Sequence, residues 1–296
     1  MLIQPLDGEV PGNGVRLHYR RWLPAEPRAG LSPILLLHGL ASSSHIWNLV
    51  ASLLAERGYL VTALDQRGHG ESDKPDSGYD FGTIVADDTA AGEALEIARP
   101  VVVGHSWGAM VALQYAVEHP GEVTALVLVD GATNQLSLRP GWSREQAQRD
   151  LAPPRFAGTP RETFLSYFKS GPLGQVWSPE LEDSALHIVQ LREDDTVAPR
   201  LDFENHLQII GAMWDQPTFD LYRRVTCPVK LIVAEPQTSG EARREFFALR
   251  LEGIVRIQEI CPRLELVRMP DTIHDIPFQR PRELAEEIVA YAPPQA

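Results

Sequence analysis

Cysteine is scarce in this chain. The 296 residues include only Cys227 and Cys261, each followed by a proline and neither part of a C-x-x-C pattern. Two thiols far apart in the sequence form neither a disulfide framework nor the paired spacing of a zinc site. We therefore expect two semi-buried free thiols and no metal site.

Long hydrophobic runs are missing as well. Unbroken apolar runs, such as Ile34–Leu37, are far shorter than the roughly 20 residues that span a bilayer. Residues 1–7 lack the basic segment and the long apolar stretch of a signal peptide. The sequence therefore predicts a soluble, cytoplasmic protein without a membrane span.

Positive charge is in deficit. The chain has 27 Lys and Arg against 40 Asp and Glu, which gives a formal net charge of −13. Such a surface repels phosphate backbones, and the pairs Arg223-Arg224 and Arg243-Arg244 are typical of solvated helix faces. Nucleic acid is therefore not an expected partner.

Strand-like and helical segments alternate between residues 34 and 129. The predicted strands are the apolar runs at 34–37, 59–64, 101–103 and 123–129. The predicted helices between them have apolar residues at helical spacing and lie at 46–57, 83–98 and 109–118. This alternation is typical of a parallel sheet with helices on both faces.

The alternation stops after Asp130 and resumes at Val229. Residues 134–224 hold prolines, polar stretches and helical segments without a β-branched strand run. Beyond them, the sequence predicts strands at 229–234 and 264–268 and helices at 240–260 and 282–291. We therefore predict an α/β core formed by residues 1–133 and 225–296, interrupted by a helical insertion at residues 134–224.

One pentapeptide has the pattern of a nucleophile. Gly104-His-Ser-Trp-Gly108 matches G-x-S-x-G and lies between a strand run and a helix. A serine at such a sharp turn has strained backbone angles, and the flanking glycines avoid collisions there. The helix N-terminus also favours developing negative charge. The pattern predicts that Ser106 is a nucleophile, with an ordinary strand-to-helix loop as the alternative.

Two further segments fit a serine nucleophile. His38-Gly39 follows the first buried strand, and an oxyanion hole would use the backbone N–H groups of Leu40 and Trp107. His274 lies between the last predicted strand and the closing helix, where a base that takes the serine proton belongs. The alternatives are that His38-Gly39 merely ends a strand and that His274 is a surface-loop histidine.

Together these motifs resemble the α/β-hydrolase superfamily. His38-Gly39, the stretch 65–72, Gly104–Gly108 and His274 occur in that family's order and span nearly the whole chain. The resemblance implies an α/β-hydrolase fold, with a mostly parallel twisted sheet and helices on both faces. It also implies that the glycines of 65–72 serve a tight loop more than catalysis.

The insertion is similar to the helical cap that many members carry over the active site. By resemblance, the cap would shape an apolar pocket for a small-molecule ester or acyl substrate. Leu40, Trp107 and Met110 would contribute to the floor of this pocket. The chemistry implied by the resemblance needs no metal and no other cofactor.

The carboxylate that pairs with the catalytic histidine in this family is not at its usual position in this sequence. Most members have an Asp shortly after the strand that corresponds to Val229–Ala234. In this sequence Gln237 occupies that position. A neutral amide cannot stabilise an imidazolium as a carboxylate does. Asp130 follows the neighbouring strand, from which some relatives take their acid, although many carry an Asp there in a structural role. We prefer Asp130, keep Glu235 as the alternative acid, and leave open another group or no acid.

The sequence thus predicts a carboxylesterase-like serine hydrolase, of class EC 3.1.1, with an acyl-enzyme on Ser106 and His274 as general base. Hydrolysis of an amide, a lactone or a carbon–carbon bond by the same residues is an alternative. A non-catalytic ligand-binding protein with the hydrolase fold is a further one, supported only by Gln237. We expect a monomer or a homodimer.

Overall fold

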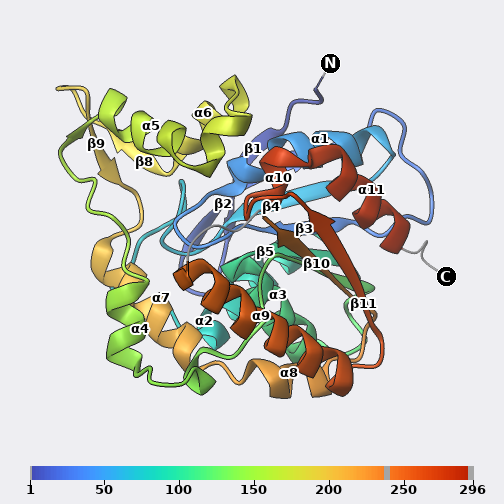
Figure 1. The fold of residues 1–296 in the computed structure, drawn as a ribbon. Helices are drawn as coiled ribbons and strands as arrows, with labels where there is room; N and C mark the ends of the chain where they lie inside the picture. Colours follow the sequence, from blue (N-terminus) through green and yellow to red (C-terminus); the bar gives the residue numbers. More distant parts are fainter. Residues whose placement is uncertain (1, 237–240, 293–296) are drawn as a thin grey trace.

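An eight-stranded, mostly parallel sheet forms the centre of the molecule (Figure 1). The structure is a computed structural model that describes residues 2–236 and 241–292, with only the backbone of 241–246. The strand order is β1-β2-β4-β3-β5-β6-β10-β11, and only the pairs β1–β2 and β2–β4 are antiparallel. The strands are β1 (Leu6–Pro11), β2 (Arg16–Trp22), β3 (Ile34–Leu37), β4 (Val61–Asp65), β5 (Val101–His105), β6 (Ala125–Val129), β10 (Val229–Glu235) and β11 (Leu264–Pro270).

Helices cover both faces of this sheet, as the sequence predicted. One face carries α1 (Asn48–Glu56), α10 (Ile276–Gln279) and α11 (Pro281–Tyr291). The other face carries α2 (Phe81–Ala94), α3 (Trp107–Glu118), α8 (Thr218–Arg224) and α9 (Glu241–Ile260). Figure 1 shows the two layers above and below the sheet.

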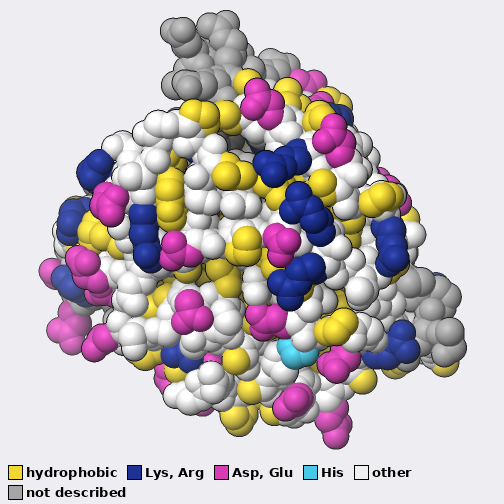
Figure 2. Space-filling model, turned by 90° about the horizontal axis from the view of Figure 1, so that it is seen from below, with side chains coloured by type: hydrophobic (Ala, Val, Ile, Leu, Met, Phe, Trp, Pro, Cys, Tyr) yellow, Lys and Arg dark blue, Asp and Glu magenta, His cyan; other side chains and the backbone are white. Residues whose placement is uncertain are grey.

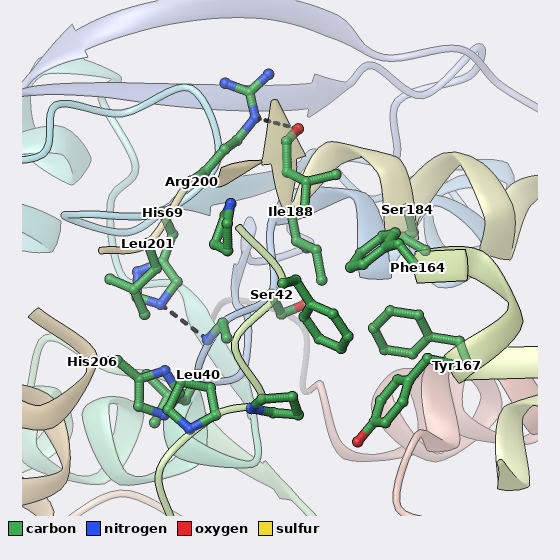
Figure 3. Close-up of a pocket in the computed structure, with 18 of the residues that line it drawn as sticks. Leu40, Ser42, His69, Phe164, Tyr167, Ser184, Ile188, Arg200, Leu201 and His206 are labelled. Carbon is green, nitrogen blue, oxygen red and sulfur yellow. Dashed lines mark hydrogen bonds between the residues drawn. The ribbon is translucent and has the colours of Figure 1, made fainter. Parts of the chain in front are cut away.

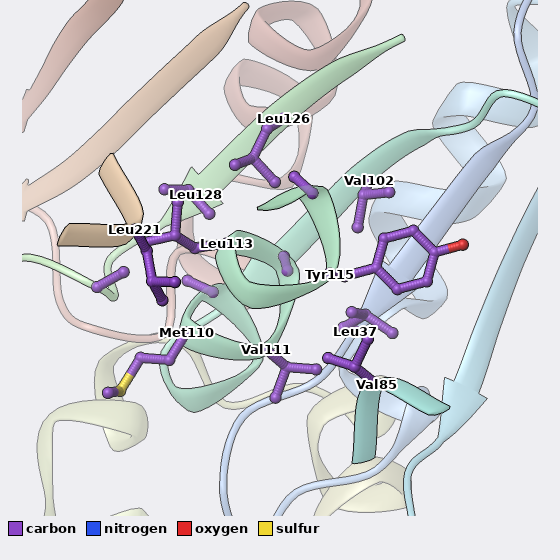
Figure 4. Close-up of a cluster of buried hydrophobic side chains, with 14 of the residues drawn as sticks. Leu37, Val85, Val102, Met110, Val111, Leu113, Tyr115, Leu126, Leu128 and Leu221 are labelled. Atoms are coloured by element: carbon purple, nitrogen blue, oxygen red, sulfur yellow. The ribbon is translucent and has the colours of Figure 1, made fainter. Parts of the chain in front are cut away.

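The central strands read as continuous apolar runs because both of their faces are buried. Successive side chains point to opposite faces of a strand. In β3, Leu35 and Leu37 therefore join the cluster beneath α2 and α3, whereas Ile34 and Leu36 join the cluster beneath α1 and α11. Figure 4 shows the first cluster around α3, with side chains from three strands: Leu37, Val102, Leu126 and Leu128.

Residues 134–224 contain both helices and a small sheet. The helices are α4 (Arg144–Asp150), α5 (Arg161–Ser170), α6 (Pro179–His187), α7 (Phe203–Asp215) and α8. The strands β7 (Thr159–Pro160), β8 (Val189–Leu191) and β9 (Thr196–Pro199) form an antiparallel sheet of order β7-β9-β8. The expectation that this segment has no strand was wrong, because strands of two to four residues are too short for a hydrophobic pattern.

Different parts of residues 134–224 lie at different places on the molecule. In Figure 1, α5 and α6 lie with the small sheet at one end of the molecule, and α4 and α7 pack against each other at its side. α8 packs on α3 and α9, beneath the large sheet. The division of the chain at residues 134 and 224 stays a prediction.

The two cysteines are free, as expected, and both are buried. No helix in the described part of the chain is long and apolar enough to cross a membrane. Figure 2 shows Lys and Arg side chains interspersed with Asp and Glu over one face of the molecule. This face offers no continuous basic surface.

Asp88, on α2, is a buried carboxyl group without a hydrogen-bond partner among the described residues. Burial and the neighbouring Asp87 raise the pKa of Asp88 well above its usual range. Because the unfolded chain gives this group an ordinary pKa, the folded state loses stability as the pH rises from that value through the raised one.

We therefore expect Asp88→Asn to be more stable than the wild type at neutral pH, by about 1–3 kcal/mol. The difference in the free energy of unfolding should shrink as the pH falls to about 4. Urea unfolding of both proteins between these pH values measures it. A difference that is constant with pH would contradict a buried, protonated Asp88.

Candidate active site

Ser106 lies at the sharp turn between β5 and α3. Its backbone has φ 55° and ψ −118°, in the sparsely populated region that the motif predicts. A Cβ on Gly104 would lie 2.1 Å from the carbonyl oxygen of Gly108, and a Cβ on Gly108 would lie 2.4 Å from the carbonyl oxygen of His38. The turn therefore requires glycine at both positions.

His274 lies in the loop between β11 and α10 and bonds to two of the predicted site residues. Its Nε2 is 2.9 Å from Ser106 Oγ, and its Nδ1 is 2.6 Å from Asp130 Oδ2. A neutral imidazole with its proton on Nδ1 donates to the carboxylate and accepts the serine O–H. The structure thus brings the three residues into one hydrogen-bonded chain.

The environment shifts the pKa values of His274 and Asp130 in opposite directions. Half of the His274 side chain is exposed, and the partial loss of solvent lowers its pKa; the hydrogen bond to Asp130 and the carboxylate charge raise it more, so the net pKa lies above the ordinary value. Burial raises the pKa of Asp130, but His274 and Arg250 lower it more, so Asp130 is held ionised. An ionised Asp130 beside a neutral His274 is the state in which Nε2 can accept a proton.

Glu235, the alternative acid, points elsewhere. Its carboxylate accepts a hydrogen bond from Arg268 at 2.6 Å, and both side chains are about 40% exposed. Among the described residues, Asp130 and not Glu235 contacts His274. Gln237 lies outside the described residues.

The loop after β3 lies against the turn at Ser106. A Cβ on Gly39 would be 3.1 Å from the Cβ of Ser106, so this backbone is in close contact with the serine. The N–H of Leu40 has no acceptor among the described residues, and that of Trp107, the first residue of α3, has none within its helix. Two such donors are what an oxyanion hole requires, and this role stays a prediction.

His69 supports the same loop, and the sequence analysis missed it. Its Nε2 accepts a hydrogen bond from Ala41 N at 3.2 Å, and its Nδ1 donates to Arg67 O at 2.9 Å. Its ring stacks on Trp107 with 5.3 Å between centroids. Burial lowers the pKa of His69 well below the usual value, so His69 supports this loop as a neutral side chain. Only its place in the stretch 65–72 could have indicated it.

His105 precedes the serine but does not bond to it. Its Nε2 donates to the backbone carbonyl of His274 at 3.0 Å, and the two imidazole centroids are 4.8 Å apart. Burial, followed by the charge of His274, lowers the pKa of His105 to about 4. His105 thus holds the His274 loop as a neutral donor, a role that local sequence does not reveal.

A cavity of about 780 Å³ lies beside Leu40 and His69. Figure 3 shows Phe164 and Tyr167, from α5, facing Leu40, His69 and His206 across it. Four aromatic rings form this wall and contact one another edge to face: Phe156, Phe164, Tyr167 and Phe168.

Only one of the three predicted pocket residues lines this cavity. Leu40 does, whereas Trp107 and Met110 are not among the lining residues. Trp107 lies beneath the ring of His69, and Met110 belongs to the buried cluster in Figure 4. Both are on the first turn of α3, whose side chains pack into the core.

One cluster of possible metal ligands occurs elsewhere among the described residues, formed by His45, Asp183 and His187. His45 Nδ1 is 2.9 Å from Asp183 Oδ2, which joins α6 to the short helix η1 (Ser44–Trp47). The two imidazole rings stack 3.4 Å apart, with 16° between their planes. Ring lone pairs lie in these nearly parallel planes, so the two nitrogens do not converge on one ion.

Comparison with known proteins agrees with this architecture. Residues 32–177 match the family model described as alpha/beta hydrolase fold. The solved E-2-(acetamidomethylene)succinate hydrolase matches 97% of this chain and 98% of its own, with a TM-score of 0.76 and 21% identity. Nearly half of the chain thus matches the α/β-hydrolase family model, and the chain has the α/β-hydrolase fold.

Other similar proteins carry different activities in their names. A non-heme chloroperoxidase of Streptomyces lividans is 38% identical over 118 residues, which are 40% of this chain and 41% of that protein. A monoacylglycerol lipase of Mycolicibacterium smegmatis is 36% identical over 129 residues, or 41% of this chain and 44% of the lipase. The chain thus spans less than half the length of the curated relatives it matches.

A thioesterase domain from the curacin biosynthetic pathway is similar over 96% of this chain and 99% of its own, with a TM-score of 0.75 and 19% identity. At this identity the likeness establishes the fold alone. Because the superfamily members differ in reaction, the chemistry has to be argued from the site.

Proposed function

We propose that this protein is a serine hydrolase that cleaves carboxylic esters, or related acyl compounds, through an acyl-enzyme on Ser106. The observation that carries the proposal is the hydrogen-bonded chain from Ser106 Oγ through His274 to Asp130. The N–H groups of Leu40 and Trp107 beside it support the same chemistry.

The proposed reaction has two halves. Oγ attacks the carbonyl carbon of the ester while His274 Nε2 takes the hydroxyl proton, and Asp130 stabilises the resulting imidazolium. The carbonyl oxygen becomes an oxyanion facing the two backbone N–H groups. His274 then protonates the departing alkoxide, which leaves the acyl group on Ser106.

Hydrolysis of the acyl-enzyme repeats these steps with water. His274 removes a proton from water, whose oxygen attacks the acyl carbon, and returns the proton to Ser106 Oγ as the bond breaks. The products are an alcohol and a carboxylic acid, and the enzyme is restored without a metal or a redox group.

The cavity supports an apolar substrate. Its volume of about 780 Å³ lies within the range of sites for small organic ligands, roughly 300–1,000 Å³. The aromatic wall, formed by Phe156 and three side chains of α5, and Leu40 on the opposite side favour an aliphatic or aromatic group between them. We infer that the acyl or alcohol part of the ester occupies this space.

Covalent labelling tests the nucleophile. A fluorophosphonate probe should label the wild type at Ser106, and p-nitrophenyl acetate should give a burst of p-nitrophenol. Ser106→Ala should lose both, because it removes the attacking oxygen. Ser42→Ala is the matched control, since Ser42 lines the cavity and has no hydrogen bond to His274 among the described residues, and it should label normally.

Each other outcome favours a different function. A wild type that takes the label but hydrolyses no ester would favour amide, lactone or carbon–carbon bond hydrolysis by the same residues. A wild type that takes no label would contradict the proposal and favour the ligand-binding alternative.

A further inference from the structure

A buried arginine lies behind the proposed acid. Arg250, on α9, is 6% exposed. Its Nη2 donates to Asp130 Oδ1, and its Nη1 donates to the carbonyl oxygen of Ala234 at 3.2 Å. One guanidinium therefore connects Asp130, at the end of β6, to the end of β10.

This connection determines which way the carboxylate faces. Oδ1 of Asp130 accepts from Arg250 and, at 2.6 Å, from the backbone N–H of Ala234. Oδ2 is thereby left to meet His274 Nδ1 at 2.6 Å. The carboxylate cannot rotate without breaking two charge-assisted hydrogen bonds in a buried site, where unpaired groups are costly.

The guanidinium also compensates a buried charge. The side chains of Asp130 and Arg250 are 4% and 7% exposed, so either ion alone would be strongly destabilised. The groups that face His274 are Asp130, with Arg250 behind it, the adjacent Asp275 and the ring of His105. Partial desolvation lowers the pKa of His274. The carboxylates of Asp130 and Asp275 raise this pKa more, and the charge of Arg250 lowers it in part.

We propose that Arg250 is a positioning residue of this site, which fixes the Asp130 carboxylate toward His274 and balances its buried charge. The inference rests on the proposed function of Ser106 and its partners. It explains how an acid at the end of β6 is held in place by a group bound to β10, the strand after which most superfamily members place their acid.

Two substitutions separate orientation from charge. Arg250→Met removes both, so kcat for p-nitrophenyl acetate should fall roughly 10- to 100-fold with little change in KM. The acidic limb of its kcat/KM profile should move to higher pH, because the charge that opposes protonation of His274 is gone. Arg250→Lys keeps the charge but cannot bridge two acceptors in this geometry. Its kcat should therefore fall, while the acidic limb of its kcat/KM profile should remain at the wild-type pH.

A double-mutant cycle tests whether Arg250 acts through Asp130. In an Asp130→Asn background, Arg250→Met should lower kcat little further, because the group it positions is already lost. Arg268→Met is the matched control, since this arginine pairs only with the exposed Glu235 among the described residues. It should leave kcat and the acidic limb unchanged.

Further measurements distinguish this proposal from the function on which it rests. Urea unfolding identifies any variant that fails to fold. If Arg250→Met does not fold, Arg250→Lys replaces it in the double-mutant cycle. If the wild type hydrolyses no ester, NMR titration of His274 still tests Arg250, and the midpoint should be higher in Arg250→Met. An unchanged midpoint, or losses in kcat that multiply in the double mutant, would overturn the proposal.

Discussion

Replacing Asp130 with asparagine is expected to lower kcat by about 10⁴-fold while the fold stays intact. The amide oxygen should take the place of Oδ1, because Ala234 N–H and Arg250 both donate there. The amide NH₂ then faces His274 Nδ1, which must accept instead of donate. The ring proton moves to Nε2, and this nitrogen can no longer accept the proton of Ser106.

The same experiment decides between the two candidate acids. Glu235→Gln is the control, because its carboxylate pairs with Arg268 at the exposed edge of the sheet, and it should turn over like the wild type. Steady-state kinetics with p-nitrophenyl acetate and a urea unfolding curve for each variant measure both effects. Normal turnover in Asp130→Asn with a loss in Glu235→Gln would reverse the assignment.

Gly131→Ala is expected to cost about 3–5 kcal/mol of folding stability and to abolish fluorophosphonate labelling. A Cβ on Gly131 would lie 2.0 Å from the carbonyl oxygen of Ser106 and 2.8 Å from the Cβ of Ala109. The Ser106 carbonyl is backbone in a strained turn, so it cannot yield as a flexible side chain would. Urea unfolding followed by tryptophan fluorescence measures the loss.

Gly92→Ala provides the matching control. Gly92 is on α2, and a Cβ there would lie 3.9 Å from the hydroxyl of Tyr115, an ordinary van der Waals distance. Because alanine is the better helix former, this variant should be as stable as the wild type or more stable, by up to about 1 kcal/mol. Equal losses in both variants would show that the contact with the turn at Ser106 is not the source of the effect.

The sheet was predictable where local pattern and burial agree. The apolar runs that became β3 and β5 stand out because they are buried on both faces. The boundaries of α2 differ from the expectation: the helix was expected at 83–98 and is observed at 81–94, with Asp80 as its N-cap. Asp and Thr are both residue types that cap helix N-termini. Only the structure shows that the Asp80 side chain accepts the hydrogen bond from the backbone N–H of Thr83.

The site was predictable to the extent that its residues lie in local motifs. Ser106 is in a pentapeptide with a steric rationale, and His274 follows the last strand in the expected order. Asp130 could be preferred because it ends a strand at the same sheet edge. Arg250 could not be found, because it reaches Asp130 across 120 positions from a helix whose sequence does not indicate which face meets the site.

The assembly of the site also has an order in time. The proposed nucleophile and acid directly follow two adjacent strands, β5 and β6, and the hydrogen bond from Ser106 N to Val129 O joins these strand ends. His274 lies 168 positions after the serine. In a chain emerging from a ribosome, Ser106 is synthesised 168 positions before His274. Under the proposed function, the growing polypeptide therefore lacks the base that takes the hydroxyl proton until residue 274 has been added.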